Sequence, residues 1–86
     1  MNFEYDPVKS ETNKNKHGID FENAQSLWSD QNRVEIETYS TIEPRIMVIG
    51  KIENKHWSAI ITYRGQTVRI ISVRRSRKSE VKLYES

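Results

Sequence analysis

A basic stretch near the C-terminus carries the residues best suited to chemistry. Residues Arg64 to Lys78 include six cations and no acid. The planar guanidinium of arginine can donate two parallel hydrogen bonds to a phosphate group. Positive charge that is held in place before a reaction starts is often the largest contribution to catalysis. The candidates to hold a phosphate are Arg64, Arg69 and Arg74, and Arg45 joins them if its strand lies alongside.

Metal-free cleavage of RNA needs two proton transfers in addition to such cations. A base must take the proton of the 2′-hydroxyl group, and an acid must protonate the leaving 5′-oxygen. His17 is the natural candidate because histidine changes its charge near neutral pH. The alternative is a structural role, in which His17 and Lys16 complement the dipole at a helix C-terminus. Lys16 could also bind phosphate, and Trp57, Tyr63 and Tyr84 could stack on bases or pack in the core.

Other catalytic chemistries find little support in the sequence. The chain has no cysteine, and its two histidines, His17 and His56, lie far apart without carboxylates at ligand spacing. It contains no glycine-rich phosphate loop and no nucleophile-elbow serine. The paired carboxylates of Glu35 and Glu37 fall on the polar side of a strand, which is expected to face solvent. We therefore expect neither a metal site nor a cofactor.

The elements that must position these residues begin with a run of strands. Trp57 to Tyr63 and Thr67 to Val73 are rich in β-branched residues, and the short Arg64-Gly65-Gln66 segment between them suits a hairpin. Alternating polar and apolar residues predict a strand at Arg33 to Ser40. Arg45 to Ile52 is expected to be the next strand, with Ile46, Val48 and Ile52 facing one way and Met47 and Ile49 the other. We expect turns at Thr41 to Pro44 and at Glu53 to Lys55. The short connections predict an antiparallel meander.

The N-terminal third predicts a short strand and two helices. The strand is Asn2 to Tyr5, and Asp6 and Pro7 then favour a helix start. That helix covers Val8 to His17 and ends at Gly18. Asp20 caps a second helix, whose core-facing stripe at helical spacing is Phe21, Ala24, Leu27 and Trp28. A last helix is expected after Ser76 as its cap, with Val81, Leu83 and Tyr84 available for packing.

This order of elements predicts an α+β fold in a single domain, residues 1–86. We expect a mainly antiparallel sheet of about five strands, two N-terminal helices and one C-terminal helix. The helices should cover one face of the sheet and leave the other open to solvent or a ligand. The sequence has no signal peptide and no apolar run near the roughly 20 residues that span a bilayer, so we expect a cytoplasmic protein without a membrane partner.

Charge is unevenly distributed along the chain. Residues 1–43 hold nine acids and four bases, whereas residues 44–86 hold three acids and ten bases. Such asymmetry favours a nucleic-acid partner. The alternative is a solvated surface on which charges cluster by chance.

The chain resembles the BrnT family of toxins in the order of its motifs. The shared N-terminal residues are Phe3-Glu4-Tyr5-Asp6-Pro7, Lys9, Asn13, Lys16-His17-Gly18, Phe21-Glu22 and Ala24. The shared C-terminal residues are Glu43, Arg45, Ile49-Gly50, Thr62, Arg64, Arg69-Ile70-Ile71-Ser72, Arg74-Arg75, Glu80 and Tyr84. The resemblance covers nearly the whole chain. It departs mildly from the family pattern at Pro44, Val73 and Ser76.

The resemblance implies a RelE-like fold and the activity of a type II toxin. Such a toxin is a metal-independent endoribonuclease that cleaves RNA and arrests translation. It is neutralised by a BrnA-like antitoxin with a ribbon-helix-helix part, and operator DNA is contacted only through that antitoxin. Carried over by motif, the catalytic candidates are His17, Arg64, Arg69 and Arg74. The RNA-binding candidates are Lys16, Arg45 and Arg75.

Two other functions share this sequence pattern. A toxin homologue that has lost cleavage would act as a module that binds RNA or an antitoxin. A ParE-like inhibitor of gyrase would have the same fold, and RNA cleavage with gyrase unaffected would separate it from a ribonuclease. Self-association, or assembly with the antitoxin, is compatible with a chain this small and polar.

Overall fold

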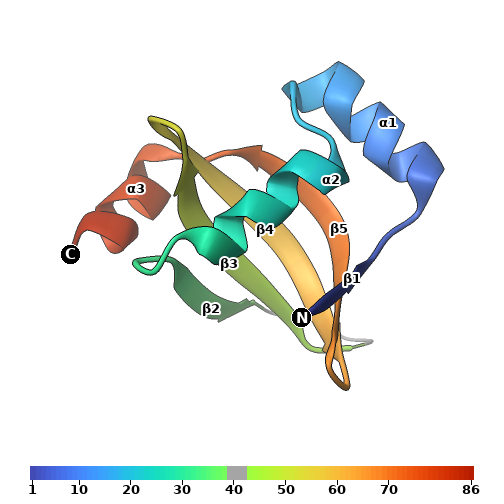
Figure 1. Ribbon diagram of the computed structural model, residues 1–86. Helices are drawn as coiled ribbons and strands as arrows, with labels where there is room; N and C mark the ends of the chain where they lie inside the picture. The colour runs from blue at the N-terminus through green and yellow to red at the C-terminus, as the bar shows by residue number, and fades with distance from the viewer. Residues whose placement is uncertain (39–42) are drawn as a thin grey trace.

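The computed structural model describes residues 1–38 and 43–86, and they form a five-stranded sheet with helices on both faces (Figure 1). The elements are β1 (Asn2–Glu4), α1 (Pro7–His17), α2 (Phe21–Ala24), the 3-10 helix η1 (Gln25–Ser29), β2 (Val34–Thr38), β3 (Arg45–Ile52), β4 (Lys55–Arg64), β5 (Thr67–Arg75) and α3 (Lys78–Glu85). The strand order is β1-β5-β4-β3-β2. The predicted α+β fold is confirmed, although the expected strand end at Tyr39-Ser40 and the turn at Thr41-Ile42 lie outside the described residues.

The strands from β2 to β5 form the predicted antiparallel meander. β1 completes the sheet by pairing with β5 in parallel, so that Phe3 lies beside Val68 and Glu4 beside Arg69. A β-bulge interrupts the pairing of β4 with β5 between Ile60 and Ile61. The N-terminal strand therefore lies directly against the strand that carries Arg69, Arg74 and Arg75.

The predicted helix boundaries at the N-terminus follow from local hydrogen bonds. Asp6 caps α1 by accepting a bond from the backbone N–H of Val8 at 2.9 Å, and Gly18 ends the helix with a φ of 85°. Asp20 caps α2 by accepting from the N–H of Asn23 at 2.7 Å. These caps confirm the predicted starts and the predicted stop.

The hydrophobic core lies between the N-terminal helices and one face of the sheet. Val48, Ala59 and Val73 form one cross-strand row and are at most 1% exposed. Leu27 of η1 packs so closely on the sheet that a Cβ at Gly50 would lie 3.0 Å from its side chain. The predicted apolar stripe packs as expected, with Phe21, Ala24 and Leu27 buried and Trp28 packed against the core.

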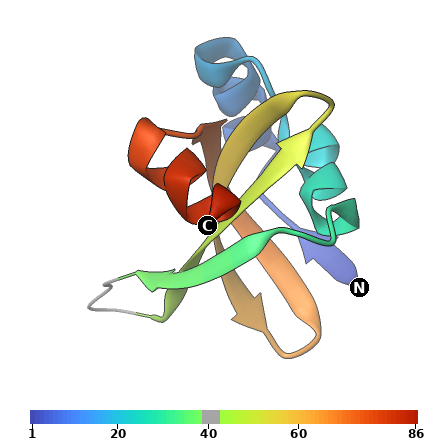
Figure 2. The same cartoon turned by 90° about the vertical axis from the view of Figure 1, so that its left-hand side faces the viewer.

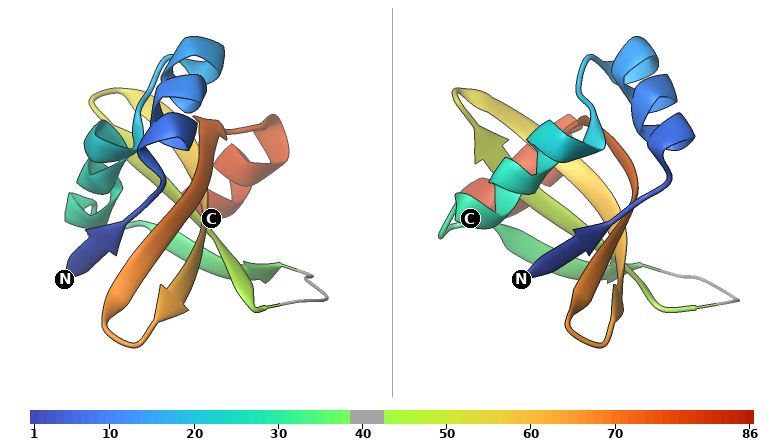
Figure 3. Two further views of the ribbon diagram at one scale, coloured as in Figure 1. Left: turned by 90° about the vertical axis from the view of Figure 1, so that its right-hand side faces the viewer. Right: turned by 45° about the vertical axis from the view of Figure 1, so that its right-hand side comes forward.

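α3 lies against the opposite face of the sheet, which corrects the expectation that the helices share one face (Figure 2 and Figure 3). Its Glu80 accepts a hydrogen bond from Ser58 of β4 and pairs with Arg74 of β5. The strand neighbours of these residues, Ala59 and Val73, point into the core, so Ser58 and Arg74 point away from it. The buried polar contacts of Glu80 with Ser58 and Arg74 therefore hold α3 on the second face.

Two further expectations about α3 were wrong. Ser76 does not cap the helix, because its hydroxyl is 2.7 Å from that of Ser58. Arg77 is the N-cap instead, and the side chain of Glu80 accepts a bond from its backbone N–H at 2.9 Å. Leu83 is 50% exposed rather than packed, whereas Tyr84 donates to Asp30 at 2.7 Å. Within the described ranges, every helix is too short or too polar to cross a bilayer.

Candidate functional site

Two of the predicted phosphate ligands lie together on the sheet face that bears α3. Arg69 of β5 pairs with Thr62 of β4 on one side and with Glu4 of β1 on the other. Its strand neighbours Val68 and Ile70 are buried in the core, so Arg69 points to the opposite face. Arg64 ends β4 and shares this part of the sheet, because both arginines approach the same carboxylate.

The ion pairs of these two arginines are long and exposed. The Glu4 carboxylate lies 3.8 Å from Arg64 and 3.6 Å from Arg69. A second contact joins Arg64 to Glu43 at 3.8 Å. The two arginine side chains remain 52% and 31% exposed. Exposed pairs of this length contribute little to stability, so a phosphate could compete for the same guanidinium groups.

Arg45 begins β3 on the same face. Its strand neighbour Ile46 packs against the core, which turns Arg45 to the other side of the sheet. Thr62, the partner of Arg69, donates to the carbonyl of Pro44 at 2.8 Å and so ties this end of β3 to β4. The buried Nε of Arg45 has no hydrogen-bond acceptor among the residues that the structure describes. Arg45 therefore extends the basic region across the sheet.

A row of three apolar residues that ends in a serine lies beside these arginines, and we call it the apolar row. Ile36, Met47, Ile60 and Ser72 face one another across β2 to β5, and all four are partly exposed. The row occupies the part of the face between the three arginines and α3. We name the surface formed by Arg45, Arg64, Arg69 and this row the open face.

Arg74 also points to this side of the sheet, but its charge has a buried partner. Its two terminal nitrogens donate to the two carboxylate oxygens of Glu80 at 2.8 and 2.7 Å. The Glu80 side chain is 9% exposed, whereas that of Arg74 is 27% exposed. The Arg74 guanidinium, with help from the N–H of Arg77 and the hydroxyl of Ser58, lowers the pKa of Glu80 to about 2 despite burial. The ion pair of Arg74 with Glu80 therefore holds α3 on the sheet.

Arg75 lies on the other face of the sheet. Its guanidinium carbon is 5.5 Å from the centre of the Trp57 ring, and its Nε donates to the carbonyl of His56 at 3.3 Å. Because it follows Arg74 in an extended strand, it points the opposite way. The structure does not bring Arg75 together with the open face.

Lys16 and His17 lie at the C-terminal end of α1, at the edge of β5. They line a hollow of about 250 Å³ together with Lys9, Thr12, Asn13, Phe21, Ile71 and Ser72. Ser72 also belongs to the open face, so the hollow adjoins that face at the edge of the sheet. The structure thus places His17 beside the strand that carries Arg69 and Arg74, with Ser72 between the two arginines in the chain.

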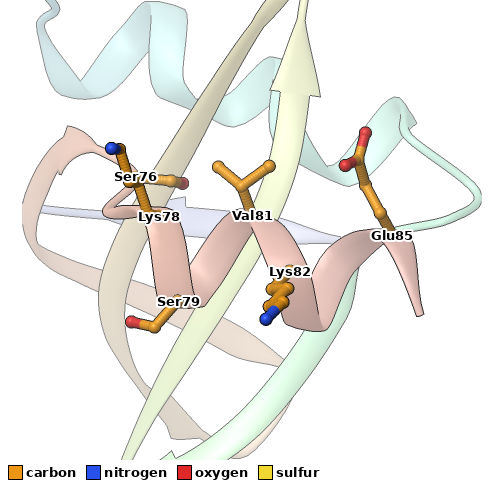
Figure 4. A pocket seen from close by; sticks show the side chains of 6 residues that line it. All are labelled: Ser76, Lys78, Ser79, Val81, Lys82 and Glu85. Atoms are coloured by element: carbon orange, nitrogen blue, oxygen red, sulfur yellow. The ribbon is translucent and has the colours of Figure 1, made fainter.

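A larger hollow of about 570 Å³ runs along α3 (Figure 4). Val81 and Glu85 point to one side of the helix, and Ser79 and Lys82 point to the other (Figure 4). None of the predicted site residues lines this hollow, so it is not part of the candidate site.

Glu4 and Glu80 were not assigned to the site from the sequence, although these two carboxylates determine which arginines are available to a ligand. Glu4 reaches Arg64 and Arg69 only because β1 pairs with β5, which the strand pattern did not predict. Glu80 follows Arg74 by six residues, but the two belong to different elements, β5 and α3, so neither the strand period nor the helix period relates them. Among residues 1–38 and 43–86, no three histidine, cysteine, aspartate or glutamate side chains gather in a group that could hold a metal ion.

Comparison with known proteins agrees with the sequence motifs. A family profile described as "Ribonuclease toxin, BrnT, of type II toxin-antitoxin system" matches residues 5–80. A search among curated proteins found no match. The profile spans most of the sheet, both N-terminal helices and the start of α3, including every predicted site residue. The chain belongs to the BrnT family of ribonuclease toxins of type II toxin–antitoxin systems.

Proposed function

We propose that this protein is a metal-independent endoribonuclease that cleaves RNA and so arrests translation. The observation that carries the proposal is the position of Arg45, Arg64 and Arg69 on the open face of a chain that belongs to a ribonuclease toxin family. Held on three neighbouring strands of one sheet, these cations are preorganised for a phosphate. The long, exposed contacts to Glu4 leave Arg64 and Arg69 able to bind one.

In the proposed reaction, the 2′-hydroxyl of the RNA loses its proton to a base and its oxygen attacks the neighbouring phosphorus. The bond from phosphorus to the 5′-oxygen breaks, and that oxygen takes a proton from an acid. The products are a 2′,3′-cyclic phosphate and a 5′-hydroxyl. Arg69 and Arg64 stabilise the charge that builds on the phosphate oxygens, and Arg45 binds the adjoining backbone.

We assign one of the two proton transfers to His17, with Lys16 beside it as a phosphate ligand. The assignment is supported by the hollow in which both lie, because that hollow adjoins the open face through Ser72. Arg74 contributes to the site through its hold on α3. The proposed cleavage step does not use Arg75, which lies on the other face of the sheet.

The partner in this proposal is a BrnA-like antitoxin with a ribbon-helix-helix DNA-binding part. Membership in a toxin–antitoxin family supports an antitoxin partner. We propose that the antitoxin neutralises the toxin in the cytoplasm and that operator DNA is contacted only through it. The exposed cations of the open face would favour acidic contacts from this partner.

Controlled expression in bacteria tests the proposal. Wild-type protein should arrest growth and fragment cellular RNA, and co-expression of a BrnA-like antitoxin should restore growth. A variant with both Arg64→Ala and Arg69→Ala should accumulate as folded protein without arrest. Folded wild-type protein that leaves growth and RNA intact would contradict the proposal and favour a homologue that has lost cleavage.

A further inference from the structure

We propose that the hollow between α1 and β5 also holds a second phosphate of the RNA backbone, next to the phosphate at which the RNA is cleaved. Its ligands are Lys9 and Lys16 of α1, with the hydroxyl of Ser72 on β5. The inference rests on the proposed function, because it takes single-stranded RNA as the substrate. It assigns binding roles to Lys9 and Ser72, which the proposed cleavage step does not use.

The side chains of α1 that line the hollow follow helical periodicity. Lys9, Thr12 and Lys16 are spaced i, i+3 and i+7, so they lie on one side of the helix. With a rise of about 1.5 Å per residue, this stripe is about 10 Å long. On the strand side, the hollow is bounded by Ile71, the extra residue of the β-bulge, and by Ser72. β-Bulges often redirect side chains beside functional sites.

The hollow is also electrostatically suited to an anion. Lys9, Lys16 and His17 contribute ammonium or imidazole groups, and none of the described residues that line it is acidic. Lys9 lies in the first turn of α1, where a cation opposes the helix dipole. A role in helix stability therefore does not explain Lys9, whereas it would explain Lys16 and His17 in the last turn.

Buried hydrogen bonds fix α1 to the edge of β5, which makes the hollow a formed site. The side-chain amide of Asn13 donates to the carbonyls of Val73 at 2.9 Å and Ile19 at 2.8 Å, and its oxygen accepts from the N–H of Val73 at 3.1 Å. The Ser10 hydroxyl accepts from the N–H of Phe21 at 2.9 Å. Lys9 and Thr12 are thus carried on a helix face that cannot slide along β5 without breaking these bonds.

The position of Ser72 connects the two phosphate sites. It lies on the open face at the end of the apolar row, and it also lines the hollow. An RNA strand whose phosphate is held by Arg69 can cross the sheet edge at Ser72 and place a further phosphate against α1. The second site would then set the position of the RNA along the protein before cleavage.

The test compares two lysines on the same helix. Lys9→Gln removes a cation from the hollow, whereas Lys14→Gln removes another exposed cation of α1 that does not line it. Equilibrium binding of a short, mixed-sequence 2′-O-methyl oligoribonucleotide, which cannot be cleaved, is measured over a range of salt concentrations. Thermal unfolding verifies that both variants are folded. Cleavage of ordinary RNA is measured separately.

The logarithm of the association constant for RNA falls linearly with the logarithm of the salt concentration. Loss of one phosphate contact to single-stranded nucleic acid should reduce the magnitude of this slope by about 0.7. We expect this change for Lys9→Gln and the wild-type slope for Lys14→Gln. Equal slopes for the two variants, or wild-type protein that does not bind the probe, would overturn the inference. If the probe binds but RNA is not cleaved, the proposed function fails, and the comparison of the two lysines still decides the inference.

Discussion

Arg69 and Arg74 occupy the same strand and point to the same side of the sheet, yet their environments differ. Arg69 meets Glu4 at 3.6 Å, in a pair whose carboxylate is 40% exposed. Arg74 binds Glu80 through two hydrogen bonds, and that carboxylate is 9% exposed. Water can compete for the first pair but hardly for the second. One arginine is therefore available to a ligand, and the other is committed to the fold.

The comparison shows that an arginine's partner, rather than its strand position, decides its use. A buried carboxylate that loses its cation is left uncompensated, which costs several kcal/mol. An exposed carboxylate that loses its cation is solvated by water at little cost. A phosphate can therefore replace Glu4 as the partner of Arg69. It cannot replace Glu80 as the partner of Arg74 without weakening the packing of α3 on the sheet.

Alanine substitution should separate the two arginines by their effect on folding. We expect Arg74→Ala to lower the free energy of unfolding by about 3 kcal/mol, because Glu80 stays buried without its cation. Arg69→Ala should lower it by less than about 1 kcal/mol. Urea unfolding followed by circular dichroism measures both values. Equal losses would mean that the two ion pairs do not differ as described.

Acid should weaken the fold through Glu80. Its pKa falls from 4.5 in the unfolded chain to about 2 in the folded protein. The stabilisation is therefore fully present above pH 4.5 and is lost as the pH falls toward 2. Each pKa unit corresponds to about 1.4 kcal/mol, so about 2 kcal/mol should disappear between pH 4.5 and pH 3.

Urea unfolding over this pH range measures the effect. Glu80→Gln should remove this part of the acid dependence, while Glu4→Gln, the matched change on the open face, should leave it in place. An unchanged acid dependence in Glu80→Gln would show that other groups cause it.

The smallest effect should come from Glu4→Gln at neutral pH. The free energy of unfolding should change by less than about 1 kcal/mol, because the contacts to Arg64 and Arg69 are long and exposed. RNA affinity should rise by less than about fivefold, since both arginines lose a competing carboxylate. Binding of a non-cleavable oligoribonucleotide provides the measurement. A fall in affinity would argue that Glu4 positions the arginines instead of competing for them.

Local signals predicted most of the elements correctly. The caps at Asp6 and Asp20 and the stop at Gly18 depend on neighbouring residues, and the alternation of Val34 to Thr38 reflects partial burial of one side of a strand. The position of α3 could not be predicted in this way. It depends on contacts of Glu80 with β4 and β5, which become adjacent only when the sheet has formed.

The candidate site was predictable as a set of residue types but not as an arrangement. The motifs indicated arginines that could bind phosphate. Arg69 and Arg74 are five residues apart, which in a regular strand puts them on opposite sides, and the extra residue of the β-bulge brings both to one side. Nothing in the sequence distinguished the committed arginine from the available one, because that difference lies in the burial of Glu80. The cross-strand pairing of β1 with β5, which brings Glu4 to the arginines, was likewise a tertiary feature.

RNA cleavage by purified protein tests the central claim most directly. Wild type, Arg69→Ala and Arg75→Ala are compared with and without translating ribosomes, after each has been shown to be folded. Arg75 is the matched control because it lies on the same strand but points to the opposite face. The account predicts that Arg69→Ala lowers the cleavage rate by at least about 100-fold, the cost typical of losing one preorganised donor, and that Arg75→Ala stays near the wild-type rate. Full activity in folded Arg69→Ala would contradict it.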